Sequence, residues 1–364
     1  MVNAFLLTHL EAMADQYSVT LCVNCSAYPL SDRIDSRIRV VDFKIAREIS
    51  VVRDAWAFLF LLSLFRAEKF SAVHSITPKA GLLAMLAARF AGIRFRHHTF
   101  TGQVWACRKG CVRFLLKALD RVIVYIASQV FADSLSQCRF LEEERVVEPG
   151  GISVLGPGSI SGVDLRRFRP DSDSRGQVRA ELGTGEDLCV FLFVGRLTKD
   201  KGISDLVRAF ATVAETNSQT ELWLVGPDEE RLSEQLDGRR SDEVGYIRWL
   251  GQKSHPERYM ASADVLVLPS YREGFGSVII EAAACAIPTV AYRIDGVIDA
   301  VVNDRTGILV EVGDVEALAA VLLDVSQDRD RRHTLGREAL ARASKEFCSD
   351  VVTAEWLAHY KRLL

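Results

Sequence analysis

Residues 265–284 read VLVLPSYREGFGSVIIEAAA. The run begins as a short apolar strand, passes through a turn that contains Gly274 and Gly276, and continues as an apolar helix from Ser277. A strand, a glycine turn and a helix in direct succession are typical of α/β folds built on parallel sheets. The stretch therefore predicts a doubly wound domain with ligand-binding groups at the carboxyl end of this strand.

The same alternation of short apolar runs and longer amphipathic runs continues on both sides. In the first half we expect strands at 18–23, 72–75, 94–99 and 130–132 and helices at 4–16, 51–68, 79–91, 111–127 and 134–143. In the second half we expect strands at 190–194, 221–225, 246–250, 265–268 and 289–291 and helices at 202–216, 277–284, 315–326, 329–347 and 351–364.

Glycines and prolines cluster at 150–170, where the periodicity fails, and this segment is the expected linker. A chain of 364 residues is also long enough for two cores. The pattern therefore predicts two Rossmann-like α/β domains, at 1–160 and 161–345, with a ligand cleft between them. The helix within 346–364 is expected to pack back toward the N-terminal domain.

The start of the chain departs from this scheme. A doubly wound domain normally opens with the strand that becomes the centre of its sheet, whereas here the helical pattern begins directly at residue 3. A sheet without its central strand would leave unpaired backbone groups and an apolar slot. We therefore expect the first strand of this domain to lie upstream, in roughly 10–15 further residues.

Composition and cysteine usage favour a cytosolic globular protein. The composition is 49% apolar and 26% charged, and the longest apolar run, 55–65, is shorter than the ~20 residues of a membrane span. We see no signal peptide, so we expect the eight cysteines to be reduced thiols. The spacings Cys22/Cys25 and Cys107/Cys111 could serve zinc, but Cys22 lies within an expected strand, so we favour plain thiols.

The net charge of −3 conceals an asymmetry between the two halves of the chain. Residues 1–170 carry 22 Lys and Arg against 15 Asp and Glu, and the remainder carries 23 against 33. The basic residues concentrate in 89–121, which contains the single acid Asp120. Such a stretch favours an anionic partner such as phosphate groups or an acidic lipid surface, although it could also be a solvated helix face. Nucleic acid is not expected, because no binding motif accompanies the stretch.

Residues 194–202, which read VGRLTKDKG, form the first candidate site. They follow an expected strand and open an expected helix, and Gly195 gives the turn its freedom. Arg196 and Lys201 place two cations at a strand end beside a helix N-terminus, which suits a diphosphate. The alternative is an ordinary strand-to-helix loop with surface cations.

The glycine turn before the helix is the second candidate site. Gly274 and Gly276 let the backbone approach a ligand closely, and the amides of 276–278 are free donors at the start of the helix. Glu281 lies one to two turns into that helix, where a carboxylate can reach a ribose diol, and Glu273 precedes the glycines. The alternative, an ordinary surface position, fits Glu281 poorly because its helical neighbours are apolar.

The pair Glu273 and Glu281, with seven residues between them, matches the E-x7-E motif of retaining GT-B glycosyltransferases, especially glycosyltransferase family 4. Residues 193–202 resemble the donor-phosphate motif of that family, and further likenesses lie at 263–270, 306–307 and the hinge 162–170. The resemblance covers nearly the whole chain. It implies a GT-B fold, with two Rossmann-like doubly wound domains and the donor cleft between them.

The resemblance also implies a role for each site residue. Arg196 and Lys201 would bind the donor diphosphate, Glu281 would hold the ribose hydroxyls, and Glu273 would bind hydroxyls of the donor sugar. The other implied donor-binding positions are Gly195, Gly251, Gln252, Gly274, Phe275, Gly276, Ser277 and Val278. No metal and no cofactor are expected, because cationic side chains and helix amides act on the phosphates and the nucleotide sugar is a substrate.

The N-terminal half matches the family more loosely. The family places a histidine just before a glycine at a strand end, and this chain reads HHTFTG at 97–102. If Gly102 is that glycine, Thr101 takes the place of the histidine and His98 stands three residues early. We expect His98 or Thr101 to contact the reacting sugar or the acceptor; the alternative is that the histidines pack structurally. Lys79 could meet an acceptor phosphate or simply begin its helix.

Residues 75–81 (SITPKAG) and 98–105 (HTFTGQVW) resemble enzymes of bacterial surface-polysaccharide assembly, such as those of lipopolysaccharide O-antigen and capsule. That likeness implies transfer of a hexose or N-acetylhexosamine from a UDP-sugar to an undecaprenyl-diphosphate-linked glycan. The basic stretch 89–121 and the apolar run 56–65 suit peripheral attachment to the anionic inner face of the cytoplasmic membrane. Two alternatives stay open: a non-catalytic, nucleotide-sugar-binding partner subunit, and a nucleotide-sugar epimerase or glucan phosphorylase on the same fold.

Overall fold

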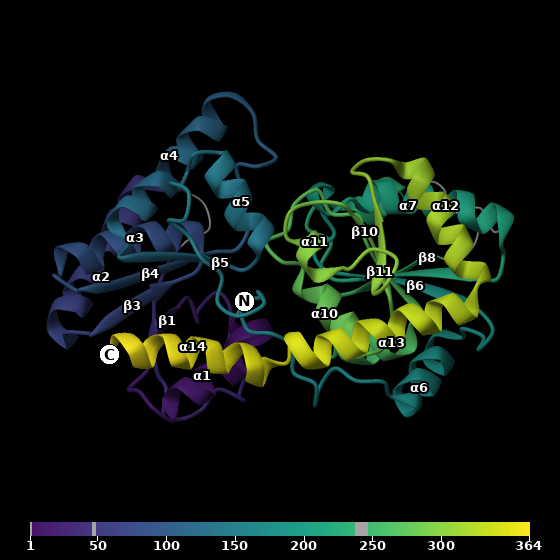
Figure 1. The fold of residues 1–364 in the computed structure, drawn as a ribbon, viewed down its shortest axis with the longest axis horizontal. Helices are drawn as coiled ribbons and strands as arrows, with labels where there is room; N and C mark the ends of the chain where they lie inside the picture. The colour runs from purple at the N-terminus through teal and green to yellow at the C-terminus, as the bar shows by residue number, and fades with distance from the viewer. Residues whose placement is uncertain (1, 46–48, 237–246) are drawn as a thin grey trace. The chain divides into compact units, whose positions relative to one another are not determined.

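The computed structural model describes residues 2–45, 49–236 and 247–364. The chain forms two compact units, and the C-terminal segment belongs to the first of them although it follows the second in the sequence. Unit 1 comprises Met1–Gly162 and Ser349–Leu364, and unit 2 comprises Val163–Cys348 (Figure 1). Each unit has its own parallel sheets and its own hydrophobic core.

Unit 2 is a doubly wound α/β domain. Its parallel sheet has the order β11-β10-β9-β6-β7-β8, so that its first strand, β6, lies at the centre. The strands are β6 (Cys189–Val194), β7 (Thr220–Val225), β8 (Ile247–Gly251), β9 (Val265–Leu268), β10 (Thr289–Tyr292) and β11 (Gly307–Val310). The central strands are almost continuously apolar because helices cover both faces of the sheet.

The helices of unit 2 lie in two layers. α7 and α12 pack together on one face of the sheet, and α6, α9, α10 and α13 lie on the other (Figure 1). The elements are α6 (Ser172–Leu182), η2 (Lys199–Lys201), α7 (Ile203–Thr216), α8 (Leu232–Leu236), α9 (Pro256–Ser262), α10 (Ser277–Ala284), α11 (Val297–Ala300), α12 (Val315–Gln327) and α13 (Arg329–Glu346). This sandwich fixes the strand ends from which the candidate site is built.

Unit 1 contains two separate parallel sheets among its described residues. One has the order β1-β2 and the other β3-β4-β5. The strands are β1 (Thr20–Val23), β2 (Arg39–Asp42), β3 (Ala72–Ser75), β4 (Phe95–Phe100) and β5 (Gln129–Ala132). Unit 2 has a single six-stranded sheet, whereas the described residues of unit 1 form these two smaller sheets.

Helices cover both faces of the larger sheet of unit 1. α3 and α4 pack on one face with α2 beside α3, and α1 and α14 lie on the other (Figure 1). Trp356 of α14 packs edge-on against Phe131 of β5, with ring centroids 5.3 Å apart. The elements are η1 (Val2–Leu6), α1 (Leu7–Ala14), α2 (Val51–Glu68), α3 (Pro78–Phe90), α4 (Gly110–Ile126), α5 (Leu135–Glu143) and α14 (Ser349–Leu363). Within the described ranges, no helix has both the length and the apolarity to cross a membrane.

Most expected elements are present, and among the described residues two strands, four helices and the short helix η2 were not predicted. The helix expected at 51–68 coincides with α2, and that expected at 4–16 is divided into η1 and α1. The unpredicted elements are the strands β2 and β11 and the helices α6, α8, α9, α11 and η2. Tyr246, the first residue of the expected strand 246–250, lies outside the described residues. The ends of β6 and β9, on which both candidate sites depend, fall where they were expected.

Candidate active site

The ends of three neighbouring strands of unit 2 are joined by backbone hydrogen bonds. The amide of Gly195, after β6, donates to Val225 O at 2.9 Å, and Leu197 N donates to Pro227 O at 2.9 Å. Gly226 N, after β7, donates to Gly251 O at 2.9 Å. These bonds hold the loops after β6, β7 and β8 at one edge of the sheet, as expected of parallel strands.

A close approach at Gly202 fixes the next loop against β9. Gly202 has a φ of 69°, and a Cβ there would lie 1.9 Å from the carbonyl oxygen of Pro269. The loop is also tied by Tyr271 N, which donates to Asp200 O at 2.9 Å. Only glycine fits such a position, so η2 is pressed against the end of β9 and the two candidate sites meet.

Lys201 and Glu273 form the centre of this edge. Lys201 Nζ donates to Glu273 Oε1 at 2.6 Å, and the two side chains are only 17% and 14% exposed. Beside them Arg272 pairs with Asp200 at 3.1 Å. The cation predicted to bind the diphosphate and the acid predicted to bind the sugar thus form an ion pair with each other.

Arg196 lies in a looser setting than Lys201. Its guanidinium donates to Glu229 Oε2 at 2.9 Å, and both side chains are more than a third exposed. An exposed ion pair of this kind contributes little stability and exchanges partners readily. Arg196 is therefore available to an incoming anion that competes with Glu229.

Helix α10 begins next to the ion pair with its first amides uncapped. Gly276, with a φ of 74°, precedes the helix, and among the described residues no side chain caps that end. A Cβ at Gly296 would lie 2.2 Å from Gly274 O, so a second glycine turn packs directly behind the first. The first-turn amides of Ser277 and Val278 are left for a ligand, and the helix dipole favours an anion there.

Glu281 lies one turn further along α10 and is half-buried. Burial raises the pKa of its carboxyl to about 8; the nearby Arg167 guanidinium lowers that pKa and Glu257 raises it. Arg167 is itself engaged by Glu257, at 2.8 Å. Of the residues that the structure describes, none donates a hydrogen bond to the Glu281 carboxyl, which leaves it available to the hydroxyls of a ligand.

The remaining predicted donor-site positions differ in what they can offer. The ring of Phe275 is buried in the core beside Phe347, with centroids 5.1 Å apart, so only its backbone can face a ligand. Gly251 ends β8 with a φ of 67°, and it and Gln252 are exposed. A nucleobase could therefore stack or hydrogen-bond at this loop, but not on the Phe275 ring.

Sequence reasoning missed two features of this edge. Asp205, in the first turn of α7, accepts hydrogen bonds from Tyr271 Oη at 2.6 Å and from Tyr292 Oη at 3.0 Å, which braces the glycine loop. The hydroxyl of Ser270 is fully buried and has no hydrogen-bond partner in the described structure. Asp205 carried a weak signal, an acid at a helix start, whereas its two tyrosine partners lie 66 and 87 residues away.

The predicted residues of the N-terminal half all belong to unit 1. His98 is fully buried: its Nδ1 lies 2.8 Å from Ser75 Oγ, and a Cβ at Gly81 would lie 2.5 Å from its ring. Burial lowers the pKa of this imidazole to about 3, so it is neutral. This environment fits the alternative that the histidine packs structurally. Contact between His98 and a sugar stays a prediction, and the ring has no exposed surface for that contact.

Three other unit 1 positions were predicted to contact acceptor or sugar. Thr101 is half-buried just after β4, and Gly102 is buried with a φ of 88°. Lys79 lies in the first turn of α3 and pairs with Asp54 of α2 at 2.6 Å. Thr101 and Lys79 therefore retain the surface that a contact requires.

The cysteines weighed as zinc ligands are free thiols, and no three metal-binding side chains gather in the described ranges. Cys22 and Cys25 are half-buried, whereas Cys107 and Cys111 are exposed. Across residues 2–45, 49–236 and 247–364, no group of three or more His, Cys, Asp or Glu side chains could hold a metal ion.

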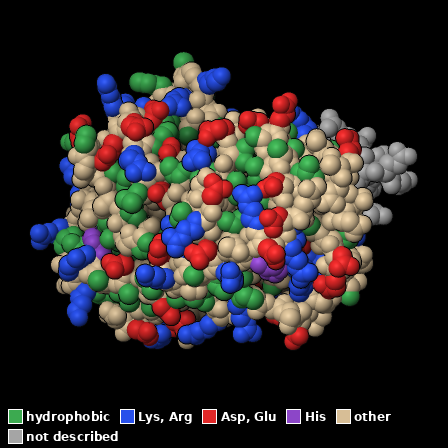
Figure 2. Space-filling model, turned by 45° about the vertical axis from the view of Figure 1, so that its right-hand side comes forward, with side chains coloured by type: hydrophobic (Ala, Val, Ile, Leu, Met, Phe, Trp, Pro, Cys, Tyr) green, Lys and Arg blue, Asp and Glu red, His purple; other side chains and the backbone are tan. Residues whose placement is uncertain are grey.

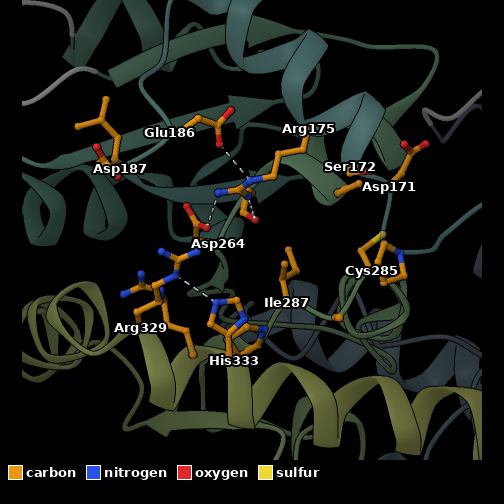
Figure 3. A pocket seen from close by; sticks show the side chains of 17 residues that line it. Asp171, Ser172, Arg175, Glu186, Asp187, Asp264, Cys285, Ile287, Arg329 and His333 are labelled. Carbon is orange, nitrogen blue, oxygen red and sulfur yellow. Dashed lines mark hydrogen bonds and ion pairs between the residues drawn. The ribbon is translucent and has the colours of Figure 1, made fainter.

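A second pocket of unit 2 lies at the opposite, amino edge of the sheet. Figure 3 shows its charged side chains directed at one another: Arg175 pairs with Asp264 at 3.0 Å and Arg329 contacts His333 at 3.3 Å. Asp264 and Asp187 precede β9 and β6, so this pocket is remote from the strand ends that carry Lys201. Arg175 of α6 bonds to Asp264 next to β9 and so anchors α6 to the sheet, whereas Arg329 and His333 both belong to α13.

The surface in Figure 2 shows basic and acidic side chains interspersed over the face in view. The charge asymmetry between the halves of the sequence therefore does not produce a surface of a single sign on that face. At the Lys201 edge each of the three cations Lys201, Arg196 and Arg272 forms an ion pair with an acid, so the net charge contributed by these pairs is small.

Two Rossmann-like units, one with cations, glycine turns and a helix N-terminus at its carboxyl edge, define the GT-B class. The family model "Glycosyl transferases group 1" matches residues 174–342, and "Glycosyl transferase 4-like domain" matches residues 2–158. The chain belongs to this glycosyltransferase family and is therefore an enzyme.

Individual relatives agree with the family assignment. The chain is 30% identical over 319 residues to the capsular polysaccharide biosynthesis glycosyltransferase CapM of Staphylococcus aureus, covering 87% of this chain and 83% of that protein. It is 26% identical, covering 86% and 81%, to UDP-Gal:alpha-D-GlcNAc-diphosphoundecaprenol alpha-1,3-galactosyltransferase of Escherichia coli. Its fold resembles sucrose-phosphate synthase of Thermosynechococcus elongatus, with a TM-score of 0.80 at 23% identity over 98% of this chain and 92% of that one.

Proposed function

We propose that this enzyme moves a hexose or N-acetylhexosamine from a UDP-sugar to an undecaprenyl-diphosphate-linked glycan, with retention of the anomeric configuration. The pathway would be cell-surface polysaccharide synthesis, for capsule or lipopolysaccharide O-antigen, at the inner face of the cytoplasmic membrane. The observation that carries this proposal is the Lys201–Glu273 pair beside the uncapped start of α10. The arrangement offers a cation and amides to a diphosphate and an acid to the sugar next to it.

The names of the relatives support the donor and the acceptor. The Staphylococcus aureus relative is a capsular polysaccharide glycosyltransferase, and the Escherichia coli relative is named for a UDP-sugar donor and a diphosphoundecaprenol-linked acceptor. Both alignments span more than four-fifths of this chain and of the relative. A related donor and a lipid-linked acceptor are the simplest inference for an enzyme that aligns with these relatives over most of both chains.

In the proposed mechanism the diphosphate first replaces Glu273 as the partner of Lys201. The two groups are 2.6 Å apart and largely shielded from water, so an anion that binds Lys201 must displace the carboxylate. Glu273 is then free to accept hydrogen bonds from hydroxyls of the donor sugar. Binding of the diphosphate thereby prepares the carboxylate for the sugar attached to it.

The chemical step is a front-face substitution. The acceptor hydroxyl forms a bond to the anomeric carbon on the side from which the nucleotide leaves, the bond from that carbon to the diphosphate oxygen breaks, and the hydroxyl proton passes to the leaving phosphate. The protein supplies no strong base; Lys201, Arg196 and the amides of Ser277 and Val278 stabilise the charge that grows on the diphosphate. Glu281 orients the nucleotide through its ribose hydroxyls.

The test is UDP or GDP release by the purified protein against a panel of UDP- and GDP-sugars, with a bacterial membrane extract as acceptor. We expect turnover with one UDP-hexose or UDP-N-acetylhexosamine that the extract accelerates above slow hydrolysis without acceptor and that is lost in Glu281→Ala. UDP binding without turnover on any donor would favour the non-catalytic partner subunit. Conversion of the donor to its epimer without any acceptor would favour the epimerase.

A further inference from the structure

Between Ala55 and Leu62, helix α2 in unit 1 is apolar around its whole circumference, yet only part of this stretch is buried. Ala57, Leu61 and Phe65 face the core, whereas Trp56 is 70% exposed and Leu59 is 52% exposed. A helix that is hydrophobic all round is normally buried in a core or in a membrane. The outward face of α2 is therefore unpartnered in the described structure of unit 1.

Helix α4 continues this apolar surface. Ile123 and Ile126 face the core, and Phe114, Leu115 and Tyr125 are 70%, 57% and 82% exposed. In the described part of unit 2, by contrast, the exposed large apolar side chains are Tyr271, Val302 and Val312, which lie on separate loops. Exposed apolar side chains that gather on neighbouring helices mark an interaction surface, whereas scattered ones do not.

A pocket of about 640 Å³ opens among α2, α3 and α4. This volume falls within the ~300–1,000 Å³ usual for sites that hold small molecules. Its walls are mostly apolar, and they include Phe58, Leu82, Leu86, Phe90, Leu116 and Ile123. Hydrocarbon is the chemistry that fits such walls.

Charged groups stand at two places on the wall of this pocket. At one, Lys79 pairs with Asp54, and at the other the indole of Trp105 donates to Asp120 Oδ2 at 2.7 Å. Residues 51–126, which contain all three helices, carry twelve Lys and Arg against three Asp and Glu. The segment thus combines an apolar pocket with a strong excess of positive charge.

We propose that the pocket among α2, α3 and α4 holds the hydrocarbon chain of a polyisoprenyl phosphate lipid, with the outward faces of α2 and α4 seated in the bilayer. This inference rests on the proposed function and deepens it, because it locates the lipid part of the acceptor. The cations attract the anionic headgroup and the anionic surface around it, at about 1 kcal/mol for each cation near the membrane. Lys79 meets the phosphate where the chain enters the pocket.

A second copy of the chain fits this surface less well than a lipid does. Residues 51–126 of each copy carry more cations than acids even though Arg113 and Lys117 pair with Glu144, so two apposed copies would bring positive charge together, and like charges across an interface oppose association. A nucleic acid would match the charge but not the exposed apolar side chains Trp56, Phe114 and Tyr125. An anionic lipid matches both.

The test is co-flotation of the full chain with three kinds of vesicle: phosphatidylcholine alone, phosphatidylcholine with phosphatidylglycerol, and phosphatidylcholine with undecaprenyl phosphate. Leu86→Trp fills the pocket, Trp56→Ser with Tyr125→Ser removes outward apolar contacts, and Val302→Ser in unit 2 is the matched control. Thermal unfolding of each variant checks that it folds. A milder filling variant, Leu86→Phe, replaces Leu86→Trp if that protein does not fold.

We expect the wild type to bind undecaprenyl phosphate vesicles at least tenfold more tightly than phosphatidylglycerol vesicles of equal charge. Leu86→Trp should lose that selectivity and keep the binding to phosphatidylglycerol, the double serine variant should lose both, and Val302→Ser should keep both. Equal binding of the wild type to both anionic vesicles, or unchanged selectivity in Leu86→Trp, would overturn the proposal. So would a dimer in light scattering that the double serine variant abolishes in the absence of lipid.

The proposed function is measured separately in the same preparations. Hydrolysis of a UDP-sugar without acceptor depends on unit 2 and needs no vesicle. A wild type that hydrolyses the donor but does not select undecaprenyl phosphate overturns the lipid pocket and leaves the donor assignment intact. Lipid selection that Leu86→Trp abolishes, in a protein that hydrolyses no donor, supports the pocket and overturns the donor assignment.

Discussion

Lys201 Nζ lies 2.6 Å from Glu273 Oε1, although the two residues are 72 positions apart in the sequence. Both side chains are largely buried, so each charge depends mainly on the other for its partner. The pair joins the turn after β6 to the turn after β9, which are the two segments with motif-like sequence. Its geometry pairs the two charges within one site, and the proposed mechanism requires a diphosphate to compete with the Glu273 carboxylate for Lys201.

Lys201→Ala should lower the rate of sugar transfer by ~10²–10³, because it removes one donor to the charge that develops on the leaving diphosphate. Lys199→Ala is the matched control: Lys199 lies in the same short helix, but its side chain is exposed and only its backbone amide is bonded to Glu230. The control should stay within about threefold of the wild type in steady-state UDP release, since the substitution removes an exposed side chain that forms no hydrogen bond or ion pair in the described structure. Near-full activity in Lys201→Ala would remove this residue from the mechanism.

Gly202→Ala should destabilise unit 2 and reduce activity together. The new Cβ would meet the Pro269 carbonyl at 1.9 Å, so η2 and Lys201 must shift. We expect a loss of at least ~2 kcal/mol in the free energy of unfolding, measured by urea titration. Gly183→Ala has a similar φ of 64° but open space around it, so it should cost only about 1 kcal/mol and leave the activity unchanged.

Glu281 should release a proton when UDP binds near neutral pH. Burial raises the pKa of its carboxyl to about 8, so it is protonated in the free enzyme. Ribose hydroxyls that donate to the carboxylate favour the ionised form and lower that pKa. Calorimetric titration with UDP at pH 7 in two buffers of different ionisation enthalpy measures the proton released. The release should vanish in Glu281→Gln and persist in Glu316→Gln, an exposed control.

The same carboxyl predicts a pH dependence of stability. A folded-state pKa of about 8 against an ordinary value of 4.5 means that the folded protein is the better proton binder. Its contribution is complete below about pH 4.5 and declines as the pH rises through 8. As the pH rises from 4.5 to 8, the free energy of unfolding of the wild type should therefore fall relative to that of Glu281→Gln. A constant difference across that range would contradict the raised pKa.

Unit 1 should lose stability in mild acid because of its buried histidines. Burial lowers the pKa of His9 to about 4, and that of His97 to about 4, below their ordinary value of 6.5. Such groups stabilise the fold above pH 6.5, and the stability is lost as the pH falls toward 4, by roughly 3 kcal/mol for His9 alone. His9→Leu should flatten the fall in unfolding free energy between pH 6.5 and 5, whereas the exposed His333→Leu should not.

The sequence was most informative where local pattern and burial agree. The strand, glycine turn and helix at 265–284 were predicted with the bounds of β9 and α10, because an apolar run and two glycines leave few other conformations. Strand β2 was missed because Arg39 and Asp42 bound only two apolar residues, and most of it is exposed. Helix α6 was missed because its residues are polar and it is held from outside, by Arg179 donating to Asp264 at 2.7 Å.

The candidate site could be predicted as two segments but not as one arrangement. Nothing local shows that Lys201 and Glu273 meet, since their contact depends on the order of β6 and β9 in the sheet. His98 shows that a local pattern can also predict a site that the fold buries. Its position near a strand end suggested contact with a sugar or acceptor, but Gly81 packs against its ring and the side chain is buried. Tertiary packing decides both outcomes, and a strand-end motif carries no information about what covers it.

The anomeric configuration of the product is the decisive measurement for the proposed mechanism, read by proton NMR after transfer from the UDP-sugar that gives turnover. We predict that the new glycosidic bond has the configuration of the donor, because the acceptor hydroxyl attacks from the face that the diphosphate leaves. A product of inverted configuration would contradict front-face transfer and, with it, the roles of Lys201, Glu273 and the start of α10 in that step.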